Sequence, residues 1–109
     1  MTSEANIDKT LTELKQTLVD LLGDRLERMV LFGSRARGDY TSDSDIDIAI
    51  VVKNLTRELK LRILDEIAAI ELKHLVFVST IILSEKDFNR LRERERRIAL
   101  DIEHEGKPL

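Results

Sequence analysis

Four residues in one short stretch of this chain combine the side chains that a metal and nucleotide site needs. Gly33 and Ser34 are followed, after ten residues, by Asp45 and Asp47, and apolar residues lie on both sides. A glycine at the end of a strand lets backbone N–H groups approach a phosphate, and a serine hydroxyl can donate a further hydrogen bond. The stretch therefore predicts a phosphate-binding turn beside a pair of carboxylates.

The two aspartates are the residues most suited to holding a cation. Residues two apart in a strand project to the same side, so Asp45 and Asp47 are expected to share a face. Unit charges about 4 Å apart repel by roughly 1 kcal/mol in water and about 4 kcal/mol at an effective dielectric near 20. A divalent cation between them would relieve this repulsion, and oxygen ligands favour Mg²⁺ or Mn²⁺.

The same residues also fit simpler interpretations. Gly33 and Ser34 alone could form only a tight turn with a helix cap, although Arg35 and Arg37 add positive charge beside it. Turn chemistry accounts for Asp43. It does not account for Asp47, because a charged residue inside an apolar strand is rare unless it is exposed or paired.

Two other cation or phosphate motifs fail on spacing. An EF-hand calcium loop starting at Asp43 would need glycine at its sixth position and glutamate at its twelfth, where this chain has Ile48 and Asn54. A Walker-type phosphate loop needs Gly-Lys-Ser or Gly-Lys-Thr, whereas Gly38 is followed by Asp39.

Length and composition limit the classes of function. The 109 residues suggest a single domain, residues 1–109, and the 42% apolar content supports a folded core. A net charge of -3 with 4% aromatic residues argues against direct nucleic-acid binding by a basic surface or a stacking platform. The chain has no cysteine, no signal-like start and no apolar run long enough to span a membrane, so we expect a cytoplasmic protein without a membrane partner.

Apolar spacing and turn residues predict the elements that position these side chains. The order is helix, strand, strand, helix, strand, helix, which predicts an α/β fold with a small mixed β-sheet flanked by helices. The second strand is apolar on both faces in its second half, as is typical of a central strand. The predicted segments are a helix over 7–22, a strand over 28–32, a strand over 45–52, a helix from Asn54 or Thr56 to about Lys73, a strand over 75–83, a helix from Ser84, and a last apolar segment over 98–102.

Together, Gly33-Ser34 and Asp45-x-Asp47 resemble the signature of the minimal nucleotidyltransferases of the DNA polymerase beta superfamily. The resemblance covers most of the chain, including an ending like Ile102-Glu103-His104-Glu105-Gly106. It implies a polymerase-beta-palm-like nucleotidyltransferase core and ATP as a substrate. It also implies that Gly33 and Ser34, with Arg35 and Arg37 beside them, bind the triphosphate, and that Asp45 and Asp47 are the catalytic, metal-binding residues.

One departure from the family concerns a third acid. Fuller members carry a further carboxylate on the next strand, but residues 75–83 contain none. A general base is therefore not identifiable from the sequence. Either the acceptor needs little activation, or a partner supplies the group, or catalysis is weak or lost.

The small size of the chain favours one group within the resembled family. Stand-alone minimal members resemble the antitoxin of HEPN/MNT toxin-antitoxin pairs, which implies a HEPN ribonuclease toxin as partner and adenylyl transfer from ATP to a protein hydroxyl. Two alternatives remain open. One is a catalytically weak or inert antitoxin that blocks its partner sterically. The other is a small-molecule nucleotidyltransferase that acts as a dimer, which would make the protein a homo-oligomer.

Overall fold

A computed structural model describes residues 4–41 and 45–109 of the chain. Within these residues the sequence forms five α-helices, one 3₁₀ turn and four strands. In chain order they are α1 (Glu4–Leu22), the 3₁₀ turn η1 (Gly23–Arg25), β1 (Leu26–Phe32), α2 (Ser34–Arg37), β2 (Asp47–Val52), α3 (Arg57–His74), β3 (Ser79–Ser84), α4 (Glu85–Glu93), α5 (Arg97–Glu105) and β4 (Lys107–Pro108).

The strands form one mixed sheet in the order β3-β2-β1-β4. β1 pairs antiparallel with β2 and β4, whereas β2 pairs parallel with β3. β2 is thus a central strand, and five of its six residues are buried because both of its faces are covered. The predicted α/β class and mixed sheet are confirmed.

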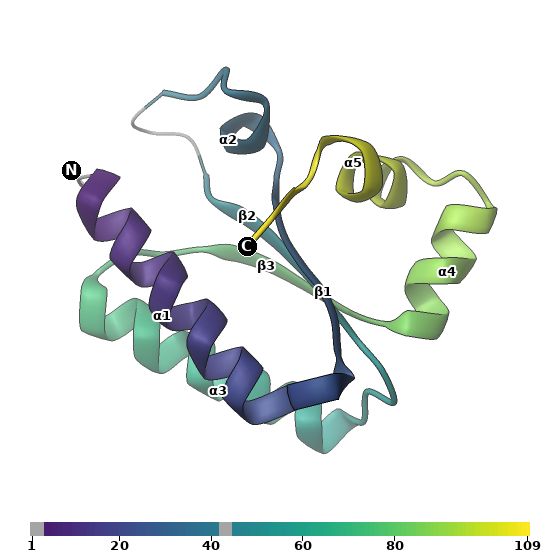
Figure 1. The fold of residues 1–109 in the computed structure, drawn as a ribbon, viewed down its shortest axis with the longest axis horizontal. Helices are drawn as coiled ribbons and strands as arrows, with labels where there is room; N and C mark the ends of the chain where they lie inside the picture. The colour runs from purple at the N-terminus through teal and green to yellow at the C-terminus, as the bar shows by residue number, and fades with distance from the viewer. Residues whose placement is uncertain (1–3, 42–44) are drawn as a thin grey trace.

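Helices cover both faces of this sheet, so the core has two layers. α1 and α3 lie on one face, and α4 and α5 lie on the other (Figure 1). Alternate residues of β2 supply the two layers: Ile48 and Ile50 pack toward α1 and α3, while Ala49 and Val51 pack with Phe88 of α4. The period-two alternation of a strand thereby also decides that Asp47 belongs to the face that carries α4 and α5.

Helix starts follow the predicted capping residues. The hydroxyl of Thr56 accepts a hydrogen bond from the N–H of Leu59 at 3.1 Å, and the hydroxyl of Ser84 accepts one from the N–H of Asp87 at 3.0 Å. Thr56, rather than Asn54, therefore caps α3.

The third strand is four residues shorter at its start than the sequence predicts. Leu75 caps α3 with φ 55°, and its N–H bonds the carbonyl of Glu71. The N–H of Val78 donates to the Glu71 carboxylate at 3.0 Å. Because the N–H groups of Leu75 and Val78 bond to Glu71 near the end of α3, they do not pair with β2, and sheet pairing begins only at Ser79.

Two features at the C-terminal end were not predicted. The helix that begins at Ser84 is interrupted after Glu93, with Glu95 at φ 52°, so that α5 runs as a separate helix. The short strand β4 pairs Lys107 with Leu31 and Pro108 with Val30. This pairing returns the chain end to β1, next to the site described below.

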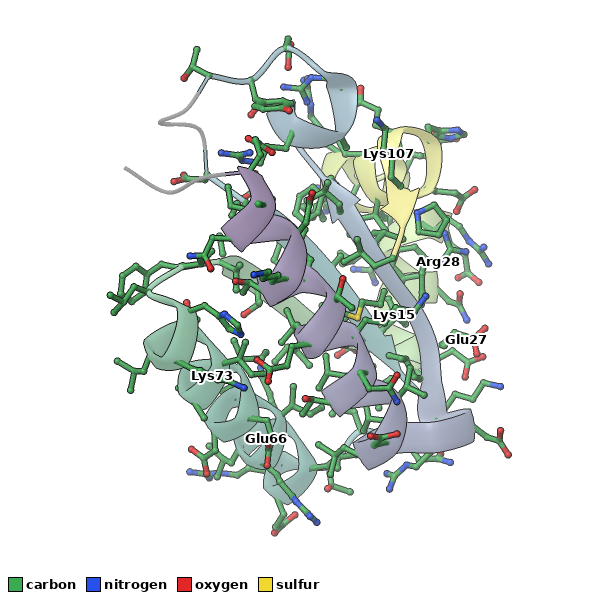
Figure 2. All side chains as sticks on the ribbon, turned by 60° about the vertical axis from the view of Figure 1, so that its left-hand side comes forward. Lys15, Glu27, Arg28, Glu66, Lys73 and Lys107 are labelled. Carbon is green, nitrogen blue, oxygen red and sulfur yellow. The ribbon has the colours of Figure 1, made fainter. Side chains whose placement is uncertain are left out.

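Surface ion pairs join the two helices of one layer. On α3, Lys73 Nζ and His74 Nε2 each lie 2.5 Å from a carboxylate oxygen of Glu13 on α1, and Figure 2 labels Lys73. These contacts lower the pKa of Glu13, the hydrogen bond from Lys73 having the largest effect.

Within residues 4–41 and 45–109, none of the helices has both the length and the apolar character needed to cross a membrane.

Candidate active site

The glycine-serine turn forms directly at the end of β1. Gly33 follows the strand with φ 77° and ψ -159°, a backbone conformation that is essentially restricted to glycine. Its carbonyl accepts hydrogen bonds from the N–H groups of Ala36 at 3.1 Å and Arg37 at 3.2 Å, which close the short helix α2. Gly38 ends this helix in the left-handed conformation, φ 85°. The segment is thus a tight loop around one helical turn.

Sheet pairing places this turn against one of the two aspartates. Phe32 is the partner of Asp47 in the antiparallel β1–β2 pair, so Gly33 lies next to Asp47. A Cβ atom added to Gly33 would collide with the Oδ2 atom of Asp47. Glycine is therefore required twice at this position, for its backbone conformation and for the close approach of the carboxylate.

The aspartates differ in their surroundings. Asp47 is the first residue of β2 and half-buried, whereas Asp45 is exposed and precedes the strand. The prediction that the strand begins at Asp45 is therefore wrong by two residues, although the carbonyl of Ile46 already accepts a hydrogen bond from Ser79 N–H at 2.8 Å. Asp43, which the sequence assigns to a turn, lies outside the described residues.

Electrostatics link the two carboxylates and one arginine. Partial burial raises the pKa of Asp47, the negative charge of Asp45 raises it further, and the positive charge of Arg37 acts in the opposite direction. The negative charge of Asp45 thus acts on Asp47, although Asp45 precedes the strand that was predicted to hold both residues. Such a like-charge pair of carboxylates is suited to a hard divalent cation, which commonly binds one or two carboxylates together with substrate phosphates.

Partial burial, together with this repulsion, predicts that Asp47→Asn stabilises the metal-free protein at about pH 7. Because the pKa of Asp47 in the folded state lies above its unfolded value of 3.8, the ionised side chain destabilises the fold above that pKa. The gain should be at most about 1 kcal/mol, or a rise in melting temperature of about 4–8 °C for a domain of this size.

Thermal unfolding in chelator, with Asp65→Asn on the exposed side of α3 as control, measures the effect. The advantage of the variant should vanish as the pH falls below the unfolded pKa of Asp47, because the wild-type carboxyl is then also neutral. An equal or lower melting temperature at neutral pH would contradict the prediction.

The two arginines of the turn occupy different environments. Arg35 is buried, its Nη1 pairs with Glu4 at 3.2 Å, and its guanidinium lies 4.7 Å from the ring centre of Tyr40. Arg37 is partly exposed and pairs with Asp39 and with Glu105 of α5. The positive charge of Arg37 acts on the carboxyl of Asp47.

The neighbouring strand presents a hydroxyl where a third acid could complete the site. Ser79 is the partner of Asp47 in the parallel β2–β3 pair, so both side chains project from the same face. Among the described residues, no group of three or more histidine, cysteine, aspartate or glutamate side chains could hold a metal ion. The residue of β3 in register with Asp47 is thus a serine and not an acid.

Two residues of this region were not singled out from the sequence, Ser79 and Glu105. Ser79 carries no charge that would mark it, and its importance comes only from its register with Asp47. Glu105 stands beside Gly106 in the family-like ending, which was the only available signal.

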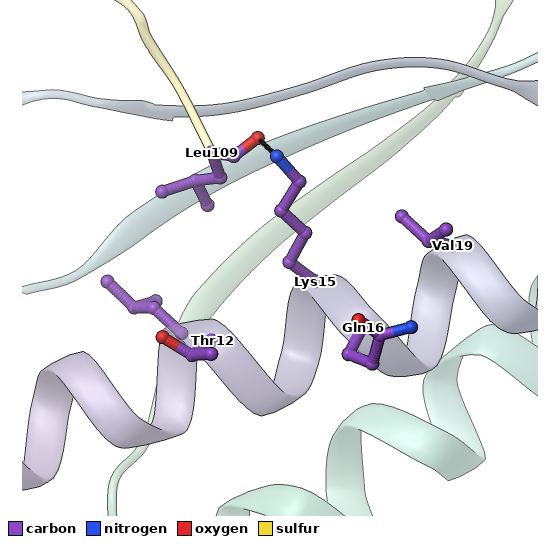
Figure 3. Close-up of a pocket in the computed structure, with 6 residues that line it drawn as sticks. Thr12, Lys15, Gln16, Val19 and Leu109 are labelled. Atoms are coloured by element: carbon purple, nitrogen blue, oxygen red, sulfur yellow. Dashed lines mark hydrogen bonds between the residues drawn. The ribbon is translucent and has the colours of Figure 1, made fainter.

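A cavity lies apart from the glycine-serine turn. Its volume is about 420 Å³, and it lies between α1 and the last residue, lined by Leu11, Thr12, Lys15, Gln16, Val19 and Leu109 (Figure 3). Lys15 Nζ donates to the carbonyl of Leu109 there. This lining contains no carboxylate side chain, whereas both aspartates lie at the glycine-serine turn, so we assign the candidate site to the turn.

Comparison with known proteins identifies the family of this chain. A family model described as "Nucleotidyltransferase domain" matches residues 11–105. The chain belongs to this nucleotidyltransferase family. The resemblance stated from the motifs is thereby confirmed, and the chain is a nucleotidyltransferase.

Relatives of this nucleotidyltransferase include two proteins of Methanocaldococcus jannaschii. One, named "Putative protein adenylyltransferase MJ0141", is 39% identical over 77 residues, which cover 70% of this chain and 78% of the relative. The other, named "Putative protein adenylyltransferase MJ0604", is 35% identical over 85 residues, which cover 78% and 81%. A solved structure described as "Crystal structure of the toxin-antitoxin with AMP-PNP" shares the fold, with a TM-score of 0.53, 22% identity, and coverage of 92% of this chain and 69% of that one.

Proposed function

We propose that this nucleotidyltransferase is an Mg²⁺-dependent protein adenylyltransferase, residues 1–109 acting as one catalytic domain, and that it transfers AMP from ATP to a hydroxyl of a partner protein. The observation that carries the proposal is the contact between Gly33 and Asp47, which joins a turn suited to phosphate with a carboxylate that Asp45 repels. The names of both M. jannaschii relatives support a protein as acceptor.

The proposed reaction is a displacement at the α-phosphorus of ATP. The acceptor oxygen forms a bond to this phosphorus, the bond to the bridging oxygen of the β-phosphate breaks, and pyrophosphate leaves with the electron pair. The proton of the acceptor hydroxyl passes to a base or to water. Such transfer depends mainly on positioning and on stabilising charge, because the protein contributes little covalent chemistry.

Each residue of the turn has a part in this proposal. Gly33 and Ser34 hold the triphosphate, Arg37 supplies positive charge beside it, and Asp45 and Asp47 hold the cation. Arg35 acts indirectly, because its pairing with Glu4 and its position over Tyr40 fix the turn. Bound Mg²⁺, or Mn²⁺, would neutralise charge on the α-phosphate and the departing pyrophosphate.

We further propose that the partner is a HEPN-family toxin, which this protein neutralises as an antitoxin, with both in the cytoplasm. Two considerations support this partner. The HEPN identity follows from the resemblance of the motifs to stand-alone minimal members, and the solved structure of the same fold is described as a toxin-antitoxin complex with AMP-PNP. The cysteine-free sequence fits a reducing compartment.

Incubation of the protein with α-labelled ATP, Mg²⁺ and the candidate toxin tests the proposal. We expect label on the toxin, loss of toxin ribonuclease activity, and no label when chelator replaces Mg²⁺. A toxin that is neutralised but never labelled would reject the enzymatic part. Label without any loss of ribonuclease activity would reject the antitoxin part.

A second candidate function, a sterically acting antitoxin without catalysis, is favoured by Ser79. In this case the position beside Asp47 lacks the third acid, and neutralisation should survive replacement of both Asp45 and Asp47 by asparagine. If the protein acts by AMP transfer, this double change releases the toxin from inhibition. If it acts sterically, the toxin stays inhibited.

Ser79 also allows a gain of function. Ser79→Asp places a third carboxylate on the face shared with Asp47, so we expect AMP transfer to rise by about tenfold, the equivalent of about 1.4 kcal/mol of added stabilisation at the metal site. Initial rates at saturating ATP measure the effect, and Ser79→Asn is the uncharged control. Equal rates in the two variants would show that this position takes no part in metal binding.

A further inference from the structure

Arg37 is held by carboxylates from two different parts of the chain. Its Nε lies 3.4 Å from Oδ2 of Asp39, and its Nη1 lies 3.2 Å from Oε2 of Glu105. The hydrogen bond to Glu105 is the main cause of the raised pKa of Arg37. Among the described residues, the other terminal nitrogen of the guanidinium, Nη2, has no carboxylate partner. Two of the three nitrogens are thus fixed, and the third remains for a ligand.

The chain end fixes Glu105 firmly relative to the turn. Glu105 is the last residue of α5. The next residue, Gly106, lies so close to Val30 that a Cβ atom on Gly106 would press on the side chain of Val30. β4 then pairs with Val30 and Leu31 of β1. Because β1 continues directly into Gly33, both ends of the Arg37–Glu105 pair are anchored to the same strand.

Arg37 also lies on the turn that borders the candidate metal site, because its backbone N–H donates to the carbonyl of Gly33 at 3.2 Å. It acts on the carboxyl of Asp47, whose Oδ2 borders Gly33. A triphosphate seated on the turn with its cation on the aspartates would therefore lie beside Arg37. A guanidinium held by two carboxylates presents its remaining N–H groups in a fixed direction, which favours bidentate binding of phosphate oxygens.

We propose that Glu105 is a positioning residue for nucleotide binding, which holds Nη1 of Arg37 so that the guanidinium points at the triphosphate of ATP. This inference rests on the proposed function, because it takes the glycine-serine turn as the phosphate site. It gives the C-terminal helix a part in the site that the motif over residues 33–47 does not include.

A purely structural role for the ion pair predicts a different outcome. The side chains of Arg37 and Glu105 are 44% and 39% exposed. Pairs between such exposed groups usually add little to folding stability. Removal of the Glu105 charge should therefore leave the melting temperature almost unchanged while it weakens ATP binding.

The test compares Glu105→Gln with wild type in ATP binding, measured calorimetrically with Mg²⁺, and in the KM and kcat of AMP transfer. We expect Kd and KM for ATP to rise by about five- to tenfold with kcat nearly constant, because a charge-assisted contact loses its orientation. The matched control is Glu103→Gln on the same helix, whose carboxylate pairs with Arg92 at 3.5 Å and should leave KM unchanged.

A double-mutant cycle separates positioning from direct contact. In the Arg37→Ala background, Glu105→Gln should have no further effect on ATP affinity, whereas a direct role of Glu105 in binding would persist. Glu105→Asp, which keeps the charge, should retain most of the affinity, and this remains measurable even if Glu105→Gln folds poorly.

Three results would overturn the inference: unchanged ATP affinity in Glu105→Gln, tighter ATP binding in that variant, or additive effects in the cycle. Tighter binding would mean that Glu105 competes with the nucleotide for Arg37. Wild-type protein that binds no ATP would instead refute the proposed function itself, so the two failures are distinguishable.

Discussion

Replacement of Asp45 and Asp47 together by asparagine is expected to reduce AMP transfer by at least a few hundredfold. The change removes both negative charges of the proposed cation site while it keeps the size of the side chains. A catalytic metal ion contributes several kcal/mol of charge stabilisation, and each 1.4 kcal/mol corresponds to about tenfold in rate. The effect is therefore among the largest that a substitution in this chain can produce.

Loss of activity must be separated from loss of the fold. The double variant should not unfold more easily than wild type in chelator, since partial burial of the Asp47 carboxylate and its repulsion by Asp45 both disfavour the ionised form. Calorimetric titration with Mn²⁺ in the presence of a non-hydrolysable ATP analogue should show binding to the wild type and none to the double variant. Transfer that continues in the double variant at the wild-type rate would reject these aspartates as the metal ligands.

Gly33→Ala is expected to lower AMP transfer by on the order of a hundredfold, because it displaces a carboxylate from its position at the reacting centre. A Cβ at this position collides with Oδ2 of Asp47, so either the turn or the carboxylate has to move. The backbone conformation of Gly33, φ 77° and ψ -159°, adds strain for any residue that carries a Cβ. Both effects act on the contact that joins the phosphate turn to the cation site.

Gly23→Ala provides the matched control for this variant. Gly23 also has a positive φ, 53°, but it lies in the turn after α1 and a Cβ there meets nothing within 4 Å. We expect it to lose about 1 kcal/mol of stability from backbone strain and no activity. If Gly33→Ala and Gly23→Ala had the same melting temperature and the same rate of AMP transfer, the collision with Asp47 would have no effect on activity.

Local patterns were sufficient for much of the fold and for the candidate residues. The residues after Asp47 are apolar on both faces of the strand, which predicts a central strand, and β2 is central. Thr56 and Ser84 were predicted as helix caps and act as such. These features depend on neighbours within about four positions along the chain, which is the range over which helix and strand periodicity operates.

Local patterns failed where a distant group determined the backbone. Residues 75–78 have the apolar composition of a strand, yet the carbonyl and carboxylate of Glu71 take the N–H groups of Leu75 and Val78. β4 was missed for a related reason. Its two residues, one of them proline, are too short to show a period and become a strand only because β1 presents a free edge.

The amino-acid sequence by itself indicated a nucleotidyltransferase, because the types and spacing of Gly33, Ser34, Asp45 and Asp47 resemble the family signature. Only the tertiary structure decided which groups meet there. The register of β1 with β2 brings Gly33 against Asp47, the register of β2 with β3 sets Ser79 beside that carboxylate, and the return of β4 brings Glu105 to Arg37. The physical reason is that these contacts depend on pairing between segments far apart in the chain, which no short-range periodicity encodes.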